Sequence, residues 1–471
     1  MDRPSPRGDD LAAGLAAIVG EDDVSTRRDE LVGYSKDAFP GDGALPDAVV
    51  RPASADEIRG ILAYAREHGH PVVPRAMGTS LTGAVIPTSG GIMMDLKPLD
   101  EIVEFSPDDM QARVQPGVQW STLNERAAEH DLHLPVDPGS SSVVTVCGMI
   151  ATNASGMRAV KYGTMADHTL GLEVVLADGT TFRTGSRSIK NSAGYDMTSL
   201  LCGSEGTLGV ITEATVQLTP TASEAATFMV IADDIEEAGH VIVSVRRSDV
   251  DVSAMEVLDR TLLEALQESG FDVPSAEAMI LLEIEGQDEP SVERDYERLR
   301  GIVAEHDVEI RESDDPDELW EARRSAYPAI VRQATHPITG DIGVPISKIP
   351  AALREIRAVK EDVDLDISVL GHAGDGNLHS VILASKGQGD EFERAHEANE
   401  RICKAAADLG GTVTAEHGVG IEKTHLLEYQ YGESGIDVMR RIKRALDPDN
   451  VLNPGKIAPL EGAAGGDAGD R

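Results

Sequence analysis

The sequence has few cysteines, few basic residues and no long apolar run. Its three cysteines are Cys147, Cys202 and Cys403, which lie far apart and form no CxxC pair. This spacing argues against an iron–sulfur module, a zinc ribbon or a disulfide framework and is typical of a reducing compartment. The N-terminus lacks the apolar core of a signal peptide, and no apolar run approaches the ~20 residues that span a bilayer. We therefore expect no transmembrane segment and a cytoplasmic protein, with loose membrane association as the alternative.

The shortage of basic residues gives the chain an extreme charge. There are 82 acidic and 42 basic residues, and the formal net charge is −40. The acidic residues are spread along the chain, which predicts a surface adapted to high intracellular salt, where screening weakens self-repulsion. An ordinary acidic enzyme is the alternative. Nucleic acid is not an expected partner, because phosphate binding needs a basic face.

The length of 471 residues predicts two or three domains. Three loops rich in small residues lie within the first half, at 74–83, 137–156 and 203–209. Such loops favour one extended cofactor lying across a domain, because small residues let backbone amides approach a ligand. A glycine-rich α+β domain without a ligand is the alternative. The first loop is neither a GxGxxG fingerprint nor a Walker loop.

From residue 221 the sequence pattern changes: segments typical of charged helices alternate with segments typical of strands up to about residue 424. This pattern predicts a second α+β domain. A short amphipathic helix is expected in the charged segment 1–40, and a helix at about 436–446 near the end. The last residues, 461–471, are rich in Gly, Ala and Asp and are expected to be disordered.

A histidine hairpin within this second domain is the clearest chemical signal. Asp375-Gly376 is a strong two-residue turn signal. Counting outward from it places His372 opposite His379, with Cβ atoms ~5 Å apart. Glu416 is a candidate third metal ligand and His417 a candidate base. Three protein ligands with an open position are typical of a catalytic metal site; solvated turn histidines without a metal are the alternative.

Six motifs in order carry a resemblance to a known family. They are PRAMGTSLTG, DPGSSSVVTVCGMIATNASG with KYGT, SAGYDMTSLLCGSEGTLGVITEATVQL, GHAGDGNLH, AEHGVG and VLNPGK. Together they resemble the FAD-linked D-2-hydroxyacid dehydrogenases, which include D-lactate, glycolate and D-2-hydroxyglutarate dehydrogenases of the vanillyl-alcohol-oxidase flavoprotein superfamily. The resemblance covers about residues 40–457.

The resemblance implies an α+β fold with a two-subdomain FAD-binding domain of the PCMH type and an α+β substrate-capping domain. The expected boundaries are an N-terminal helical arm at 1–40, the FAD-binding domain at 41–220, the capping domain at 221–425, a segment returning to the FAD domain at 426–460 and a tail at 461–471. It also implies that the pyrophosphate of FAD lies on backbone amides of Gly78, Thr79 and Ser80. The other implied cofactor-binding residues are Pro138, Gly139, Gly148, Asn153, Gly156, Gly206, Ile211 and Asn453, the last near the isoalloxazine.

Two departures from the family pattern concern the first loop. Relatives usually carry Gly-Gly where this chain has Ala76-Met77, so the bulkier residues are expected to affect the loop. Thr79 stands where some superfamily members carry a histidine bonded to the flavin. The FAD is therefore expected to be non-covalent.

The resemblance implies a mechanism for the residues around the hairpin. His372, His379 and Glu416 look like the family's divalent-metal ligands, and His417 looks like its catalytic base. Two imidazoles and a carboxylate suit Zn, Mn, Fe or Co. Arg323 matches the position of an arginine that holds the substrate carboxylate, for which a guanidinium is well shaped; a helix-surface charge is the alternative. Electrons are expected to leave to an external acceptor, such as a quinone, a cytochrome or another flavoprotein.

The expected substrate is a small D-2-hydroxy acid, D-lactate or glycolate. D-2-hydroxyglutarate dehydrogenases add a Lys just before the residue that matches Asp341 and an Asn two residues after the second hairpin histidine, whereas the two neighbourhoods here contain Thr339 and Val381. The alternatives are a D-2-hydroxyglutarate dehydrogenase, the FAD subunit of a glycolate oxidase complex, a flavoprotein that uses FAD structurally and, in a different class, a metal hydrolase.

Overall fold

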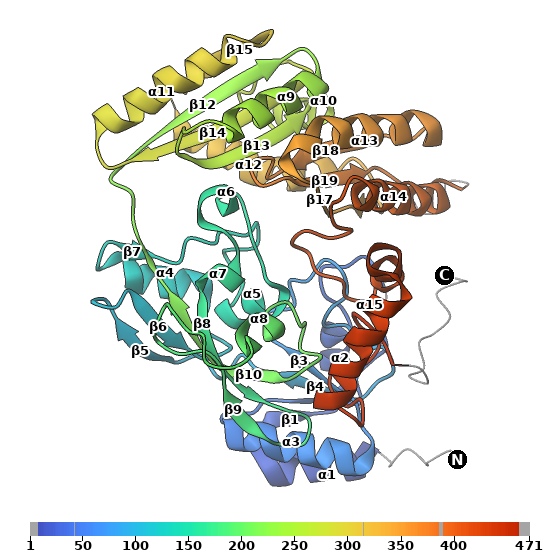
Figure 1. The fold of residues 1–471 in the computed structure, drawn as a ribbon. Helices are drawn as coiled ribbons and strands as arrows, with labels where there is room; N and C mark the ends of the chain where they lie inside the picture. Colours follow the sequence, from blue (N-terminus) through green and yellow to red (C-terminus); the bar gives the residue numbers. More distant parts are fainter. Residues whose placement is uncertain (1–7, 42, 314, 386–389, 461–471) are drawn as a thin grey trace.

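Two bodies stacked one above the other make up the molecule (Figure 1). The computed structural model describes residues 8–41, 43–313, 315–385 and 390–460. The lower body contains two main sheets and a short two-stranded ladder, all from the first half of the chain, and the upper body contains one large sheet from the second half. The tail at 461–471, predicted to be disordered, lies outside the described residues.

The first sheet of the lower body has four strands. Helix α3 (Ala55–His68) packs on it, and Ser54 caps this helix by accepting a hydrogen bond from the backbone N–H of Glu57. Gly69 ends α3 in the left-handed conformation. The strand order is β1 (Val24–Ser25), β2 (Ala48–Val50), β4 (Ile92–Asp95) and β3 (Val72–Arg75). The other elements around this sheet are α1 (Gly8–Val19), the turn η1 (Glu21–Asp23) and α2 (Arg28–Tyr34).

The second sheet of the lower body is antiparallel and has five strands. Its order is β5 (Ile102–Ser106), β6 (Gln111–Val114), β10 (Val210–Gln217), β8 (Thr169–Val175) and β9 (Thr181–Arg183). A short ladder joins β7 (Leu132–His133) to β11 (Thr219–Pro220). The helices between these strands are α4 (Trp120–Ala128), α5 (Val146–Thr152), α6 (Ala159–Tyr162), α7 (Met165–His168) and α8 (Met197–Leu201).

The upper body is one antiparallel sheet covered by helices on both faces. One hydrophobic core contains residues of α9, α11, α13 and α14, and the other contains residues of α10 and α12, which explains why β13 is buried along its whole length. The strand order is β15 (Val308–Glu312), β12 (Glu224–Ala232), β14 (Ala278–Gly286), β13 (Val252–Asp259), β18 (Ile367–Gly371), β19 (Asn377–Ile382) and β16 (Ile338–Thr339), with β17 (Ile342–Gly343) also paired to β19. The helices are α9 (Ile235–Arg246), α10 (Arg260–Glu268), α11 (Glu289–Val303), α12 (Pro316–Val331), the turn η2 (Ile346–Lys348), α13 (Ile349–Val363) and α14 (Glu391–Asp408).

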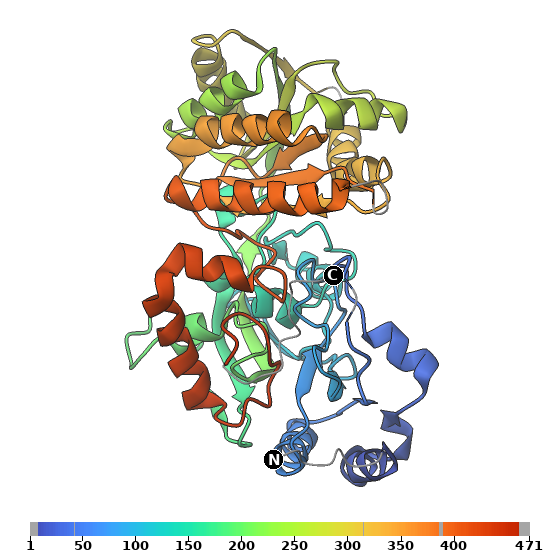
Figure 2. The same cartoon turned by 90° about the vertical axis from the view of Figure 1, so that its right-hand side faces the viewer.

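The chain returns to the lower body at its end. Helix α15 (Thr424–Leu446) descends beside that body, and Figure 2 shows its bend. The bend lies at Gly432, whose φ of 68° is non-helical. Beyond the helix, Leu452 bridges to Val72 of β3. The helix begins 12 residues before the predicted start near 436, because the sequence around Gly432 obscured its first turns.

Candidate active site

The histidine hairpin forms, but its register differs from the prediction. His379 pairs with Leu370, so the predicted pairing of His372 with His379 is wrong by two residues. The turn is longer than two residues, since the backbone N–H of Asn377 donates to the carbonyl of His372. Side chains of a strand alternate with a period of two, so a shift of two residues leaves both histidines on the same face. Their ring centroids lie 5.3 Å apart.

The two imidazoles converge on Glu416. The Nε2 atoms of His372 and His379 each lie 3.2 Å from Glu416 Oε1. The other oxygen of Glu416 accepts a hydrogen bond of 2.7 Å from Ser155, a residue of the lower body. His417 stacks on His379, with ring centroids 4.9 Å apart. The structure thus brings together all four residues that the sequence singled out around the hairpin.

Burial and charge set the protonation of this group. Burial lowers the pKa of His372, but the carboxylates of Glu256 and Glu416 outweigh it and raise that pKa well above its usual value. Burial raises the pKa of Glu416, and the imidazole of His372 reverses this and lowers it well below its usual range. Burial lowers the pKa of His417 to about 4. A neutral His417 near pH 7 can accept a proton.

Glu256 is a functional residue that the sequence reasoning missed. It lies on β13 with no exposed surface, and its Oε1 is 2.8 Å from His372 Nδ1. Its Oε2 accepts a hydrogen bond of 2.7 Å from Arg323 Nε. A carboxylate on the far nitrogen of an imidazole fixes the ring so that Nε2 faces a metal. The available signal was an acidic residue within the apolar strand SAMEVLD.

Asp341 was also missed and holds the loop that carries Glu416 and His417. Its Oδ2 accepts hydrogen bonds from the backbone N–H groups of Ala415, Glu416 and His417, at 2.9, 3.1 and 2.9 Å. Burial raises the pKa of Asp341, but the electrostatic interactions with His417 and Lys423 outweigh burial and lower it. The sequence offered only one acidic residue in the short segment ITGDIGVP.

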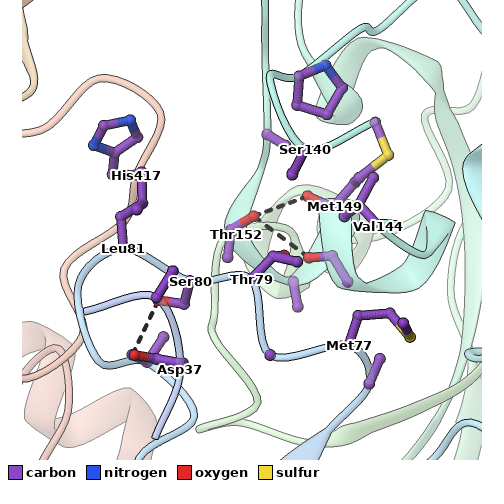
Figure 3. Close-up of a pocket in the computed structure, with 18 of the residues that line it drawn as sticks. Asp37, Met77, Thr79, Ser80, Leu81, Ser140, Val144, Met149, Thr152 and His417 are labelled. Atoms are coloured by element: carbon purple, nitrogen blue, oxygen red, sulfur yellow. Dashed lines mark hydrogen bonds between the residues drawn. The ribbon is translucent and has the colours of Figure 1, made fainter. Parts of the chain in front are cut away.

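A cavity of about 790 Å³ joins this group to the small-residue loops of the lower body. Figure 3 shows Thr79 and Ser80 of the first loop beside Thr152 of α5, with His417 on a loop across from them. The predicted residues that line the cavity are Gly78, Thr79, Ser80, Pro138, Gly139, Gly148, Gly206, Ile211, Arg323, His372, His379, Glu416 and His417.

Three predicted cofactor-binding residues do not line the cavity and instead support its walls. Asn153 ends α5 at a φ of 52° and accepts a hydrogen bond from the backbone of Ala166. Gly156 leaves no space for a side chain, since a Cβ there would lie 2.0 Å from the carbonyl oxygen of Asp137. Asn453 donates to the carbonyls of Ala84 and Glu205.

The residues at the first departure from the family pattern face the cavity. Ala76 and Met77 both line it, and Figure 3 shows the side chain of Met77. The following residue remains a glycine for a steric reason: Gly78 has a φ of 69°, and a Cβ there would lie 2.1 Å from the guanidinium of Arg75. The turn of the loop is therefore kept while its surface becomes more apolar.

Comparisons with known proteins identify the family. Residues 221–457 match the family described as FAD linked oxidases, C-terminal domain, and residues 46–185 match the FAD binding domain. The chain belongs to the FAD-linked oxidases. It is 38% identical to the glycolate oxidase subunit GlcD of Bacillus subtilis over 95% of this chain and 96% of that protein. It is 33% identical to the probable mitochondrial D-lactate dehydrogenase of Danio rerio, over 96% and 92%.

The fold of this FAD-linked oxidase agrees with the predicted class. A crystal structure of p-cresol methylhydroxylase with substrate bound superposes with a TM-score of 0.81 at 19% identity, covering 96% of each chain. The α+β class with a PCMH-type FAD-binding domain is thereby confirmed, and the family models and curated relatives confirm the predicted family. The protein is an FAD-dependent oxidoreductase. Across the described ranges, no helix combines the length and apolarity needed to cross a membrane.

The cavity of this oxidase suits FAD. Its volume lies within the range of roughly 300–1,000 Å³ that is common for ligand sites. Backbone of Gly78, Gly139, Gly148 and Gly206 lines it without side chains that would block a close approach. At the other end, one nitrogen from each hairpin histidine and one oxygen of Glu416 lie within 4.8 Å of one another, which is the donor set of a divalent-metal site.

The two neighbouring arginines of α12 differ in their surroundings. Arg323 is buried, contacts Glu256 through Nε and Nη2, and also lines the cavity. Arg324 is exposed and also lines the cavity. The sequence offered no second anchor at Thr339 and Val381, whereas Arg324, next to Arg323, lies on the cavity lining, where only the packing of α12 places it.

Proposed function

We propose that this oxidase converts a small D-2-hydroxy acid, D-lactate or glycolate, to the 2-oxo acid. The observation that carries the proposal is one cavity that is lined both by the small-residue loops of the lower body and by His372, His379, Glu416 and His417. The similarity to GlcD and to a D-lactate dehydrogenase over nearly the whole chain supports the same substrate class. A metal hydrolase would leave the FAD-binding loops without a role.

Different residues of the chain would bind the metal and accept the proton of the substrate. His417 takes the proton of the C2 hydroxyl at its imidazole, because burial keeps the pKa of this residue at about 4 and the ring neutral near pH 7. His372, His379 and Glu416 would hold a Zn, Mn, Fe or Co ion, whose chemistry is to polarise the hydroxyl. The FAD-binding loops would hold FAD, whose chemistry would be to take up the hydride from C2. Thr79 in the first loop supports a non-covalent flavin.

Arg323 is the proposed anchor of the substrate carboxylate. Its Nε and Nη2 both contact Glu256 Oε2, and a guanidinium has five N–H donors, so further donors remain for a carboxylate in the cavity. Glu256 also contacts His372, so one buried carboxylate orients both the anchor and a proposed metal ligand. The C2–H bond would then be aimed by groups fixed to one strand.

A second candidate is a D-2-hydroxy dicarboxylate, such as D-malate or D-2-hydroxyglutarate. Arg324 favours it, because a second cation lines the cavity close to Arg323 in sequence. Thr339 and Val381 favour the smaller substrate: Val381 is fully buried in the core and offers no polar group. The GlcD similarity also supports a third arrangement, in which the chain is one subunit of a glycolate oxidase complex and passes electrons to partners.

Turnover of a substrate panel with an artificial electron acceptor tests the proposal. The assay compares D-lactate, glycolate, D-malate, D-2-hydroxyglutarate and L-lactate in molar KCl, for wild type and Arg324→Gln. We expect D-lactate or glycolate to have the highest kcat/KM and Arg324→Gln to leave it within about threefold, which is under 1 kcal/mol. Preference for a dicarboxylate that falls at least ~30-fold in Arg324→Gln, about 2 kcal/mol, would establish the second candidate.

A further inference from the structure

Glu205 joins the lower body, which contains the proposed FAD-binding loops (the cofactor side), to the loop that follows His417. Its Oε1 accepts a hydrogen bond of 2.6 Å from the backbone N–H of Val419, and its Oε2 one of 2.9 Å from Gly420. The carboxylate is buried and lies in the loop between α8 and β10, in the lower body. It therefore fixes a loop that is more than 200 residues away in sequence.

The backbone on both sides is adapted to this contact. Gly418 has a φ of 81°, and a Cβ there would lie 2.5 Å from Glu205 Oε1, so a larger residue would push the carboxylate away. Glu205 itself has a φ of 50°, which is uncommon for a residue with a side chain. Such conformations persist where the surrounding structure holds them, and they cluster at functional sites.

The main chain of Glu205 is itself firmly held. Its N–H donates to the carbonyl of Ala151 at 2.8 Å, and its carbonyl accepts 2.7 Å from the side-chain amide of Asn453. Asn453 in turn accepts from Lys456 at 2.5 Å. Burial raises the pKa of Glu205 above its usual value, and the two N–H donors and Lys456 offset part of this rise. The carboxylate thus extends from a rigid base.

A second contact from the cofactor side supports the same loop. The hydroxyl of Thr82, at the end of the first small-residue loop, donates to the carbonyl of His417 at 3.3 Å. The carbonyl of Thr82 accepts 3.0 Å from the N–H of Ile421. Asp341 holds the residues before His417 from the upper body, whereas Thr82 and Glu205 hold those after it from the lower body.

We propose that Glu205 is a positioning residue, which fixes the backbone of Val419 and Gly420 and so sets where His417 stands relative to the FAD-binding loops. The role of His417 as the base rests on the proposed function; the clamp on the loop does not. Because Glu205 belongs to a loop that lines the cavity, the position of His417 depends on a residue of the cofactor side.

Hydrogen–deuterium exchange of the holoenzyme tests the clamp directly. Glu205→Gln keeps the size of the side chain but replaces one acceptor by a donor that faces a backbone N–H. The matched control is Asp259→Asn, another buried carboxylate that accepts two backbone N–H groups, from Leu262 and Val369, away from this loop. We expect the amides of Val419 and Gly420 to exchange at least ~10-fold faster in Glu205→Gln and to be unchanged in Asp259→Asn.

Stopped-flow reduction of the flavin by D-lactate gives the functional readout. A base displaced by about 1 Å predicts a ~10- to 100-fold slower reduction in Glu205→Gln, with KM, FAD content and metal content within about threefold of wild type. Wild-type exchange at both amides, or equal changes in Asp259→Asn, would overturn the proposal. If Glu205→Gln does not fold, Glu205→Asp, which withdraws the carboxylate by one methylene, is held to the same exchange criterion. An absence of flavin reduction in wild type would contradict the proposed function and leave the exchange result standing.

Discussion

Replacing Glu256 by glutamine tests the buried carboxylate behind the proposed metal site. Glu256 is fully buried and contacts both His372 Nδ1, at 2.8 Å, and Arg323 Nε, at 2.7 Å. Glutamine has nearly the same volume, so the change removes the charge and one acceptor while the packing remains. In the metal-free protein, Arg323 and the protonated His372 then lose their shared counter-charge.

Two magnitudes follow from this geometry. A change in the carboxylate that orients a metal-ligating histidine typically lowers metal affinity by about 10- to 100-fold, or roughly 1.4–2.8 kcal/mol. Removing one partner of a buried ion pair costs about 3–5 kcal/mol, and the remaining amide oxygen favours the lower end. For a domain of this size, about 3 kcal/mol corresponds to a fall in Tm of roughly 6–12 °C.

The assay is a metal titration of the chelator-treated FAD-bound protein, together with thermal unfolding. Glu283→Gln is the matched control, because Glu283 is a buried carboxylate on the neighbouring strand β14 that pairs with Arg158 at 2.8 Å and is distant from the histidines in the ladder. Glu283→Gln is expected to lower stability without changing metal affinity. If Glu256→Gln binds the metal within about twofold of wild type, the orienting role of Glu256 is refuted.

Two further predictions concern a buried lysine and the metal. Burial lowers the pKa of Lys456 to about 7 from 10.5. Between pH 7 and 10.5 the unfolded chain therefore binds more protons than the folded protein, and the free energy of unfolding rises with pH. Relative to Lys456→Met, wild type should gain up to about 1.4 kcal/mol per pH unit from 7.5 to 9.5, and the same pH dependence in both proteins would contradict this. Removal of the metal by a chelator should leave the flavin spectrum unchanged but slow the reduction of the flavin by D-lactate at least ~100-fold, with recovery on adding Mn²⁺ or Zn²⁺. If protein that elemental analysis shows to be metal-free reduces its flavin at the wild-type rate, a catalytic metal is excluded.

The histidine hairpin shows what local sequence can and cannot predict. Asp375-Gly376 and the spaced histidines predicted the hairpin and the shared face, because both depend on residues close together in the chain. The register was wrong by two residues, since the length of the turn depends on how it packs: a Cβ on Gly376 would lie 2.2 Å from the carbonyl oxygen of Val344. The period of two made this error harmless for the site.

The supporting carboxylates could not be found in the same way. Glu256 and Asp341 act through contacts with residues 67 to 116 positions away, which only the tertiary fold brings together. Arg324 illustrates the converse, because its place on the cavity depends on how α12 packs. The three small-residue loops were visible in the sequence, but their meeting in one cavity depends on the topology of two sheets.

An anaerobic visible spectrum, recorded before and after adding D-lactate, tests the central claim most directly. The claim is that one cavity holds FAD beside the group of His372, His379, Glu416 and His417 and oxidises a D-2-hydroxy acid there. We predict that the flavin band of the protein in molar KCl bleaches with D-lactate and remains oxidised with L-lactate. A flavin band that stays oxidised with D-lactate and with every other D-2-hydroxy acid of the panel would contradict the account.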